Sequence, residues 1–194
     1  MCSAAADSPA ASRRPNIVIF LADDQGWGDV GFHNPAVYSP RMDALAASGV
    51  RFTQHYVMPQ CTPTRVALMT GRYPSRFGPQ AQQANNAPAF PLGTPTLATL
   101  LKAAGYSTHL VGKWHMGEAA SASRRLDDPQ PGFDHWVSFA GQGHYYPTRL
   151  RNGLMNQLNI NGEHVPQKGY ITDELTDYAV DYLSQRTSEN PFFL

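Results

Sequence analysis

Three short segments of this 194-residue chain carry side chains suited to chemistry. The first is the carboxylate pair Asp23-Asp24, which directly follows an apolar run. Two adjacent carboxylates at the end of a buried strand repel each other and are costly to desolvate, and a divalent cation relieves both penalties. The pair therefore indicates a metal site. An exposed pair of loop acids, or a helix cap, is the alternative.

The second segment is Cys61-Thr62-Pro63-Thr64-Arg65, at the expected start of a helix. A cysteine there faces the positive end of the helix dipole and unpaired backbone N–H groups, which favour a thiolate or a bound anion. Arg65, one turn later, is expected over the same place. The segment predicts an activated nucleophile or an anion site. A small buried cysteine beside a surface arginine is the alternative, and a cysteine protease is less favoured because nothing within the segment supplies its histidine.

The third segment is Gly112-Lys113-Trp114-His115, at the expected end of a strand. Residues two apart on a strand point to the same face, so Lys113 and His115 are expected to lie side by side. A cation beside an imidazole suits an anionic substrate and proton transfer. A pair of solvated polar residues at a strand exit is the alternative.

The composition excludes several classes of protein. Hydrophobic residues make up 42%, which is too many for a disordered chain. The 15 basic and 15 acidic residues cancel, so no charge excess points to nucleic acid or to an anionic membrane. No apolar run reaches the roughly 18 residues of a transmembrane helix. Two cysteines cannot build a disulfide-rich scaffold.

The elements that must position these segments predict an α/β fold. Residues 16–22 (NIVIFLA) predict a parallel strand buried on both faces. Helices are expected from Ser39-Pro40 to Gly49, from just after Cys61 to Gly71, from Thr94-Pro95 to Gly105, and from a cap at Thr172 through Leu183. Further strands are expected at 50–56, 106–115 and 192–194, whereas 117–161 shows no clear pattern. The order favours a mainly parallel central sheet flanked by helices, with ligands beyond the carboxyl ends of its strands.

The two ends of the chain carry their own expectations. Residues 1–14 predict a disordered tail or an export or lipoprotein tether, because Cys2 is followed by small and polar residues. Residues 192–194 predict a buried strand of three residues, where strands usually have about 5–6. We therefore expect the rest of the chain to be the N-terminal portion of a longer domain, truncated on its C-terminal side.

The three segments together resemble the sulfatase family of the alkaline phosphatase-like superfamily. The matching stretches are PNIVIFLADDQGWGDVG, CTPTRVALMTGRYP and GYSTHLVGKWHMG, in that order, followed by GYITDELTDYAVDYL and NPFFL. The resemblance covers about residues 15–194. It implies an alkaline phosphatase-like fold, of which residues 15–194 are the N-terminal portion of a sulfatase catalytic domain.

The resemblance implies a modified nucleophile on a metal. Cys61 matches the residue that a formylglycine-generating maturation enzyme oxidises to Cα-formylglycine. One hydroxyl of the hydrated aldehyde attacks the sulfur of a sulfate ester, and the alcohol leaves. The second hydroxyl then loses its proton, and sulfate is expelled as the aldehyde re-forms. Asp23, Asp24 and the modified residue 61 match ligands of Ca²⁺, with Mg²⁺ as the alternative. The remaining ligands are expected beyond Leu194, because Ca²⁺ takes about 6–8 oxygens.

The resemblance also implies roles for three further side chains. Arg65 matches a residue that orients the hydrated aldehyde, and Lys113 matches a cation that binds the sulfate group. His115 matches a residue that contacts the diol and helps to deprotonate it. One departure from the family pattern is Thr64, which stands where Ser or Ala is commoner.

The function implied is that of a sulfuric ester hydrolase, arylsulfatase-like in its motif. The stretch Gly141-Gln142-Gly143-His144-Tyr145-Tyr146 resembles segments of sulfatases that act on sulfated sugars, which favours a carbohydrate or glycosaminoglycan sulfate. A phosphonate or phosphodiester hydrolase of the same superfamily is one alternative, and an inactive truncated remnant is another. The implied partners are a sulfate ester and the maturation enzyme, and the implied location is the periplasm or a lipid-anchored position at the cell surface.

Overall fold

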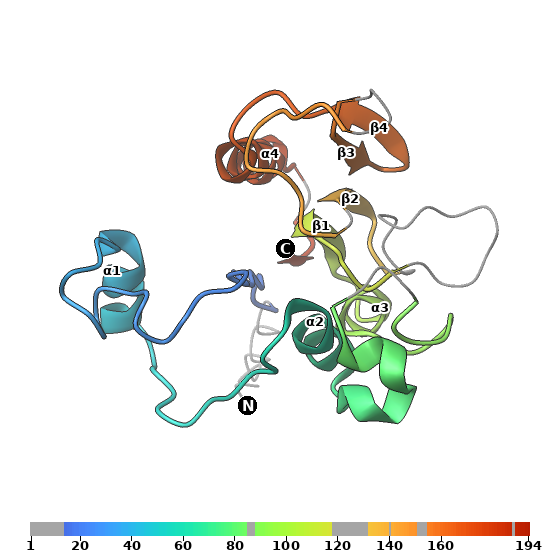
Figure 1. Cartoon of the computed structure of the whole chain (residues 1–194). Coiled ribbons are helices and arrows are strands. Elements are labelled where there is room, and N and C mark those ends of the chain that lie inside the picture. Colours follow the sequence, from blue (N-terminus) through green and yellow to red (C-terminus); the bar gives the residue numbers. More distant parts are fainter. Residues whose placement is uncertain (1–13, 85–87, 118–131, 140, 151–154, 188) are drawn as a thin grey trace, which may run out of the picture.

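The computed structural model describes residues 14–84, 88–117, 132–139, 141–150, 155–187 and 189–194. The elements are, in chain order, α1 (Pro40–Ser48), α2 (Cys61–Thr70), the 3-10 turns η1 (Pro74–Phe77) and η2 (Pro79–Gln82), α3 (Leu97–Ala103), β1 (Ser107–Lys113), β2 (His135–Phe139), β3 (Gln157–Ile160), β4 (Glu163–Pro166), α4 (Ile171–Gln185) and β5 (Phe192–Phe193) (Figure 1). None of the described helices has the length and apolar character needed to cross a membrane. The tail with Cys2 lies outside the described residues.

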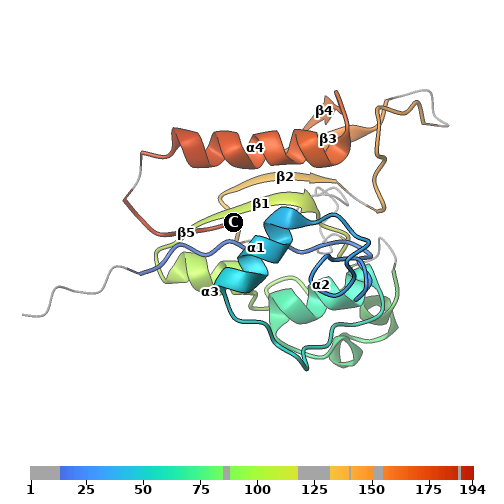
Figure 2. The ribbon, with the colours of Figure 1, turned by 90° about the vertical axis from the view of Figure 1, so that its left-hand side faces the viewer.

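One five-stranded sheet organises the chain, in the order β4-β3-β2-β1-β5. β1 pairs in parallel with both β2 and β5, whereas β2–β3 and β3–β4 are antiparallel. Helix α4 covers one face of the sheet, and α2 and α3 lie on the other (Figure 2). The α/β fold with a parallel centre flanked by helices is therefore confirmed, with an antiparallel edge that the sequence did not predict.

The main apolar core lies between β1 and the helices α2 and α3. Val66 of α2 and Ala98 of α3 are fully buried there, together with Trp114 directly after β1. The Trp114 indole donates a hydrogen bond to the Gly117 carbonyl oxygen at 2.9 Å. Burial of one such apolar side chain contributes about 1.5–3 kcal/mol. This packing fixes the carboxyl end of β1 against the first turn of α2, where two of the chemical segments meet.

The first predicted strand differs in the structure. Ile17 donates to Phe192 O at 2.8 Å and accepts from Leu194 N at 2.9 Å, so this segment runs along β5. It is not buried on both faces, because Phe20 is 87% exposed and no described strand lies along its other edge. The strand predicted at 50–56 is absent, because this segment pairs with no described strand and contains a turn.

Two predicted helix starts are wrong by a few residues. α3 begins after Thr96, whose hydroxyl accepts from Thr99 N while Thr99 Oγ1 accepts from Thr96 N. This reciprocal capping box outweighs the preference for proline in the first turn. α4 begins at Ile171, and no side chain caps its first N–H groups, so Thr172 is not its cap.

The segment without a clear sequence pattern contains β2 and β3. β3 and β4 form a hairpin that turns at Asn161-Gly162, where both φ angles are positive (52° and 94°). Such a turn matches the right-handed twist of the two strands and strongly favours Asn-Gly. The dipeptide was the available signal for this hairpin.

Candidate functional site

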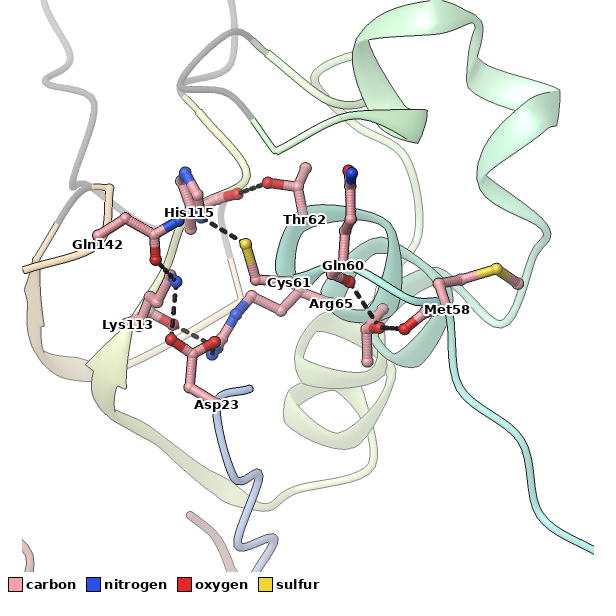
Figure 3. A network of polar contacts seen from close by, with 10 residues as sticks. Asp23, Met58, Gln60, Cys61, Thr62, Arg65, Lys113, His115 and Gln142 are labelled. Carbon is pink, nitrogen blue, oxygen red and sulfur yellow. Dashed lines mark hydrogen bonds and ion pairs between the residues drawn. The ribbon is translucent and has the colours of Figure 1, made fainter. Parts of the chain in front are cut away.

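The nucleophile candidate lies where helix α2 begins. Cys61 is the first residue of α2, and its Sγ lies 3.1 Å from Nδ1 of His115 (Figure 3). Both side chains are buried. The sequence segment around Cys61 did not predict a histidine partner. The structure supplies one, His115, from the residues that follow β1. A sulfur or oxygen nucleophile on residue 61 has an imidazole within hydrogen-bonding distance.

His115 is held in an unusual backbone conformation. Strand β1 ends at Lys113, and His115 has a φ of 48°, in the left-handed region that L-residues rarely adopt. Thr62 Oγ1, fully buried in the first turn of α2, donates a hydrogen bond to the His115 carbonyl oxygen at 2.8 Å. Lys113 and His115 do lie in one site, as the sequence predicted. The cause differs from the prediction: the strand ends at Lys113 and the backbone turns, so His115 is not on the strand and the alternation of side chains does not apply to it.

Arg65 connects the helix to the other two segments. Its Nη1 donates to the Lys113 carbonyl oxygen at 2.6 Å, and its Nη2 makes an ion pair with Asp23 Oδ1 at 3.2 Å. The side chain is buried, and its Nε has no hydrogen-bond acceptor among the described residues. An unpaired N–H in a buried site is costly, so an additional oxygen next to Arg65 fits this environment.

Lys113 is enclosed by two acceptors. Its side chain is 3% exposed, and Nζ donates to Asp23 Oδ2 at 2.8 Å and to Gln142 Oε1 at 2.7 Å. Gln142 comes from the loop after β2 and was not among the predicted site residues. The available hints were its position between two glycines and its place in the stretch that resembles sugar sulfatases, whereas the distant contact itself has no sequence signature.

The electrostatics keep Asp23 charged and His115 neutral. Partial burial raises the pKa of Asp23, but hydrogen bonds from Lys113 and Arg65 outweigh it and lower this pKa below its usual value. Burial lowers the pKa of His115, and the positive charges of Lys113 and Arg65 lower it further. A neutral imidazole at pH 7 can accept a proton from the group it faces.

Two carboxylates of the site are of a type that binds a metal ion. Asp23 and Asp24 stand together after the first extended segment, and Asp24 has a φ of 56°. In the described part of the chain, no three His, Cys, Asp or Glu side chains gather as metal ligands. Two carboxylates suit a hard cation such as Ca²⁺, which takes about 6–8 oxygens, so they fit one side of its shell and leave the other side to further donors.

Comparison with known proteins gives consistent matches. The family model described as Sulfatase matches residues 15–194. Mouse arylsulfatase J is 40% identical over 71% of this chain and 23% of its own length. An N-acetylglucosamine-6-O-sulfatase of Bacteroides thetaiotaomicron is 31% identical over 99% of this chain and 31% of its own length. The solved structure of BT4656 in complex with its substrate D-glucosamine-2-N,6-O-disulfate has a TM-score of 0.74 at 31% identity, covering 93% of this chain and 33% of that one. The chain thus spans about a quarter to a third of these relatives.

Proposed function

This chain belongs to the sulfatase family, and we propose that the intact protein hydrolyses sulfate esters carried by saccharides. One observation carries the proposal: the contact of Cys61 with His115 at the start of a helix, within a cluster that contains Arg65 and Lys113. The arrangement combines a nucleophile position, a neutral base and two cations. A sulfate ester is an anion whose reaction needs each of these parts.

The saccharide part of the proposal is supported by similarity. One relative is named for the 6-O-sulfate of N-acetylglucosamine, and one solved structure contains a sulfated glucosamine as its substrate. In this chain, the exposed aromatic rings of Tyr145 and Tyr146 lie on the loop that also carries Gln142. Exposed aromatic rings offer flat apolar faces suited to one side of a sugar.

The chemistry proposed at residue 61 depends on its modification. Oxidised to Cα-formylglycine, this residue supplies a hydrated aldehyde whose hydroxyl attacks sulfur, which a plain thiol cannot imitate. Arg65 Nε has no acceptor among the described residues, which supports a role as donor to an oxygen on this side chain. His115 Nδ1 lies 3.1 Å from Cys61 Sγ, which supports a role in taking up the proton of this side chain.

The cations of the site act on the sulfate group. The Lys113 ammonium is fixed by Asp23 and Gln142, so it cannot swing away into solvent. We propose that it neutralises charge on the sulfate oxygens, where a preorganised cation in a buried site is effective. Asp23 and Asp24 would hold one side of a Ca²⁺ ion, with Mg²⁺ as the alternative, and the cation would supply Lewis acidity.

The proposal is tested first at residue 61. The protein is expressed in a host with sulfatase-maturation machinery, and the tryptic peptide Phe52 to Arg65 is weighed. We expect a peptide lighter than the cysteine form that reacts with an aldehyde probe. A thiol that alkylates completely, in a host shown to convert a control protein, would favour an inactive remnant.

The reaction type is tested by comparative turnover in the intact, modified protein. We expect a sulfated monosaccharide and an aryl sulfate to be cleaved faster than an aryl phosphodiester. A faster phosphodiester reaction would overturn the sulfatase proposal in favour of a phosphodiester hydrolase on the same scaffold.

A further inference from the structure

The amide of Gln142 has a fixed orientation in the site. Its Oε1 accepts a hydrogen bond from Lys113 Nζ at 2.7 Å. An ammonium group has donors and no acceptor, so the amide must turn its oxygen toward Lys113. The NH₂ group of Gln142 consequently faces away from Lys113 with two donors. In the close-up, a dashed line joins Gln142 to Lys113, and Gln142 lies on the side of the network away from Cys61 (Figure 3).

The loop around Gln142 is built to present this side chain. Gly141 and Gly143 have φ angles of 65° and 72°, in the left-handed region that glycine tolerates best. A Cβ on Gly143 would lie 2.6 Å from the Phe139 ring at the end of β2. The loop therefore packs tightly on β2 while the Gln142 residue itself stays exposed. The backbone thus holds the Gln142 amide, with its two donors, beside the buried ammonium.

The same loop continues into an aromatic surface. Tyr145 and Tyr146 are 71% and 65% exposed. Their ring centroids lie 6.1 and 5.4 Å from that of Tyr170, so the three rings support one another. The Gln142 amide contacts the ammonium that we assign to the sulfate group, and its loop also carries apolar rings suited to a sugar face.

We propose that Gln142 is a specificity-determining residue that donates hydrogen bonds to an oxygen of the sugar carrying the sulfate ester. The proposal rests on the proposed function, and it assigns Lys113 to the sulfate group and Gln142 to the alcohol portion. A site built to hydrogen-bond a substrate oxygen discriminates strongly against substrates that lack it. Aryl sulfates have no oxygen beside the ester for Gln142 to contact.

The kinetic test compares two substrates of the intact, modified protein. Gln142→Met removes both donors, together with the oxygen that Lys113 contacts, without adding charge. Loss of the Lys113 contact lowers kcat/KM for every sulfate ester, so we expect kcat/KM for D-glucosamine 6-sulfate to fall about tenfold or more beyond the fall measured for 4-nitrophenyl sulfate. Gln185→Met, the same substitution near the end of α4, serves as the control. Equal losses for both substrates would overturn the proposal, because Gln142 would then act only through Lys113.

A binding measurement keeps the proposal testable without turnover. The side-chain amide of Gln142 gives a pair of NMR signals, assigned by their absence in Gln142→Met. We expect D-glucosamine 6-sulfate to shift this pair and inorganic sulfate to leave it nearly unchanged. Equal shifts with inorganic sulfate, or no shift with either probe, would overturn the proposal. Absence of turnover in the wild type with a selective NMR shift would instead contradict the proposed function alone.

Discussion

Thr62 occupies the second position of the C-x-P-x-R motif, and its hydroxyl supports another segment of the chain. It donates to the carbonyl oxygen of His115 at 2.8 Å, and both residues are buried. The left-handed backbone of His115 costs about 1–3 kcal/mol, which the surrounding contacts must offset. The distance between His115 Nδ1 and residue 61 therefore depends on Thr62 as well as on β1.

We predict that Thr62→Val lowers the turnover of the intact protein. Valine has the shape of threonine without the donor, so the buried His115 carbonyl loses a partner worth about 1–3 kcal/mol. We expect kcat to fall about tenfold or more, while Thr62→Ser, which keeps the hydroxyl, stays within about threefold. Both variants are compared at equal modification of residue 61, measured by mass. Similar kcat values for the two variants would show that this hydrogen bond does not position His115.

His109 carries a separate prediction, on stability against pH. It lines a cavity between β1 and α4 with His135, Tyr182 and Arg186, and it is 7% exposed. Burial, with the positive charge of a protonated His135 and of Arg186, lowers the pKa of His109 to about 4, although Asp134 opposes the shift.

The sign of the effect follows from proton uptake. Between pH 6.5 and about 4, the unfolded chain binds a proton at His109 that the folded chain refuses. The free energy of unfolding therefore decreases as pH falls through this window. We expect this residue to account for about 1–3 kcal/mol, allowing for solvent in the cavity. Urea unfolding at pH 7 and pH 4 should show a smaller loss for His109→Gln than for the wild type. His144→Gln, at an exposed position, is the control and should match the wild type; a match by His109→Gln as well would contradict the prediction.

At the scale of elements, the contact between α3 and the start of β2 leaves no room for a side chain. A Cβ on Gly132 would lie 2.7 Å from Thr99 N in α3, and its φ is 130°. The Gly132 carbonyl oxygen also accepts from Thr108 Oγ1 of β1 at 2.5 Å. This glycine allows α3, β1 and β2 to approach at one point.

We predict that Gly132→Ala destabilises the fold by about 2–4 kcal/mol, because backbone strain and overpacking add. Gly112→Ala is a matched control, since Gly112 has a similar φ of 126° but no atom within 4 Å of the added Cβ. It should lose about 1–2 kcal/mol, the strain component alone. The free energies of unfolding in urea give both values. Equal losses would show that the close approach of α3 contributes nothing.

At the scale of the whole molecule, the segment before α2 is poorly covered. Phe20, Trp27 and Phe52 are 87%, 76% and 78% exposed. A segment that exposes several large apolar side chains is unusual for a free surface. The two relatives described above are about three times as long as this chain, and we expect additional polypeptide to cover this segment in the intact protein.

The incomplete metal shell leads to a prediction about the 194-residue chain alone. We propose Asp23 and Asp24 as two of the ligands, and the described residues contain no group of three or more His, Cys, Asp or Glu side chains that could hold a metal. We expect this chain to bind Ca²⁺ weakly and to release no sulfate, whereas the intact, modified protein does both. Calorimetric Ca²⁺ titration and a sulfate-release assay measure the two properties. An Asp23→Asn, Asp24→Asn variant of the intact protein should lose Ca²⁺ binding. Clear sulfate release by the 194-residue chain would contradict the prediction.

What the sequence alone determined is local. The apolar run before Asp23, the proline and cysteine at the start of α2, and the alternation of strand and helix each depend on neighbouring residues, whose preferences are visible in a short window. The family resemblance was also carried by contiguous motifs, and the family model confirms it over residues 15–194. The catalytic, binding and metal roles of the six predicted site residues stay predictions.

What only the tertiary structure decided is non-local. Cys61 and His115 are 54 positions apart, Asp23 and Lys113 are 90 apart, and Lys113 and Gln142 are 29 apart. These distances depend on how the first extended segment runs along β5, how the end of β1 lies against the start of α2, and how β1 pairs with β2. No sequence window encodes that packing. The same reason explains the errors: residues 16–22 have strand composition, but burial on both faces requires neighbours on both sides. Short sequence motifs thus identified the residues of the site, whereas the contacts between those residues depend on long-range packing.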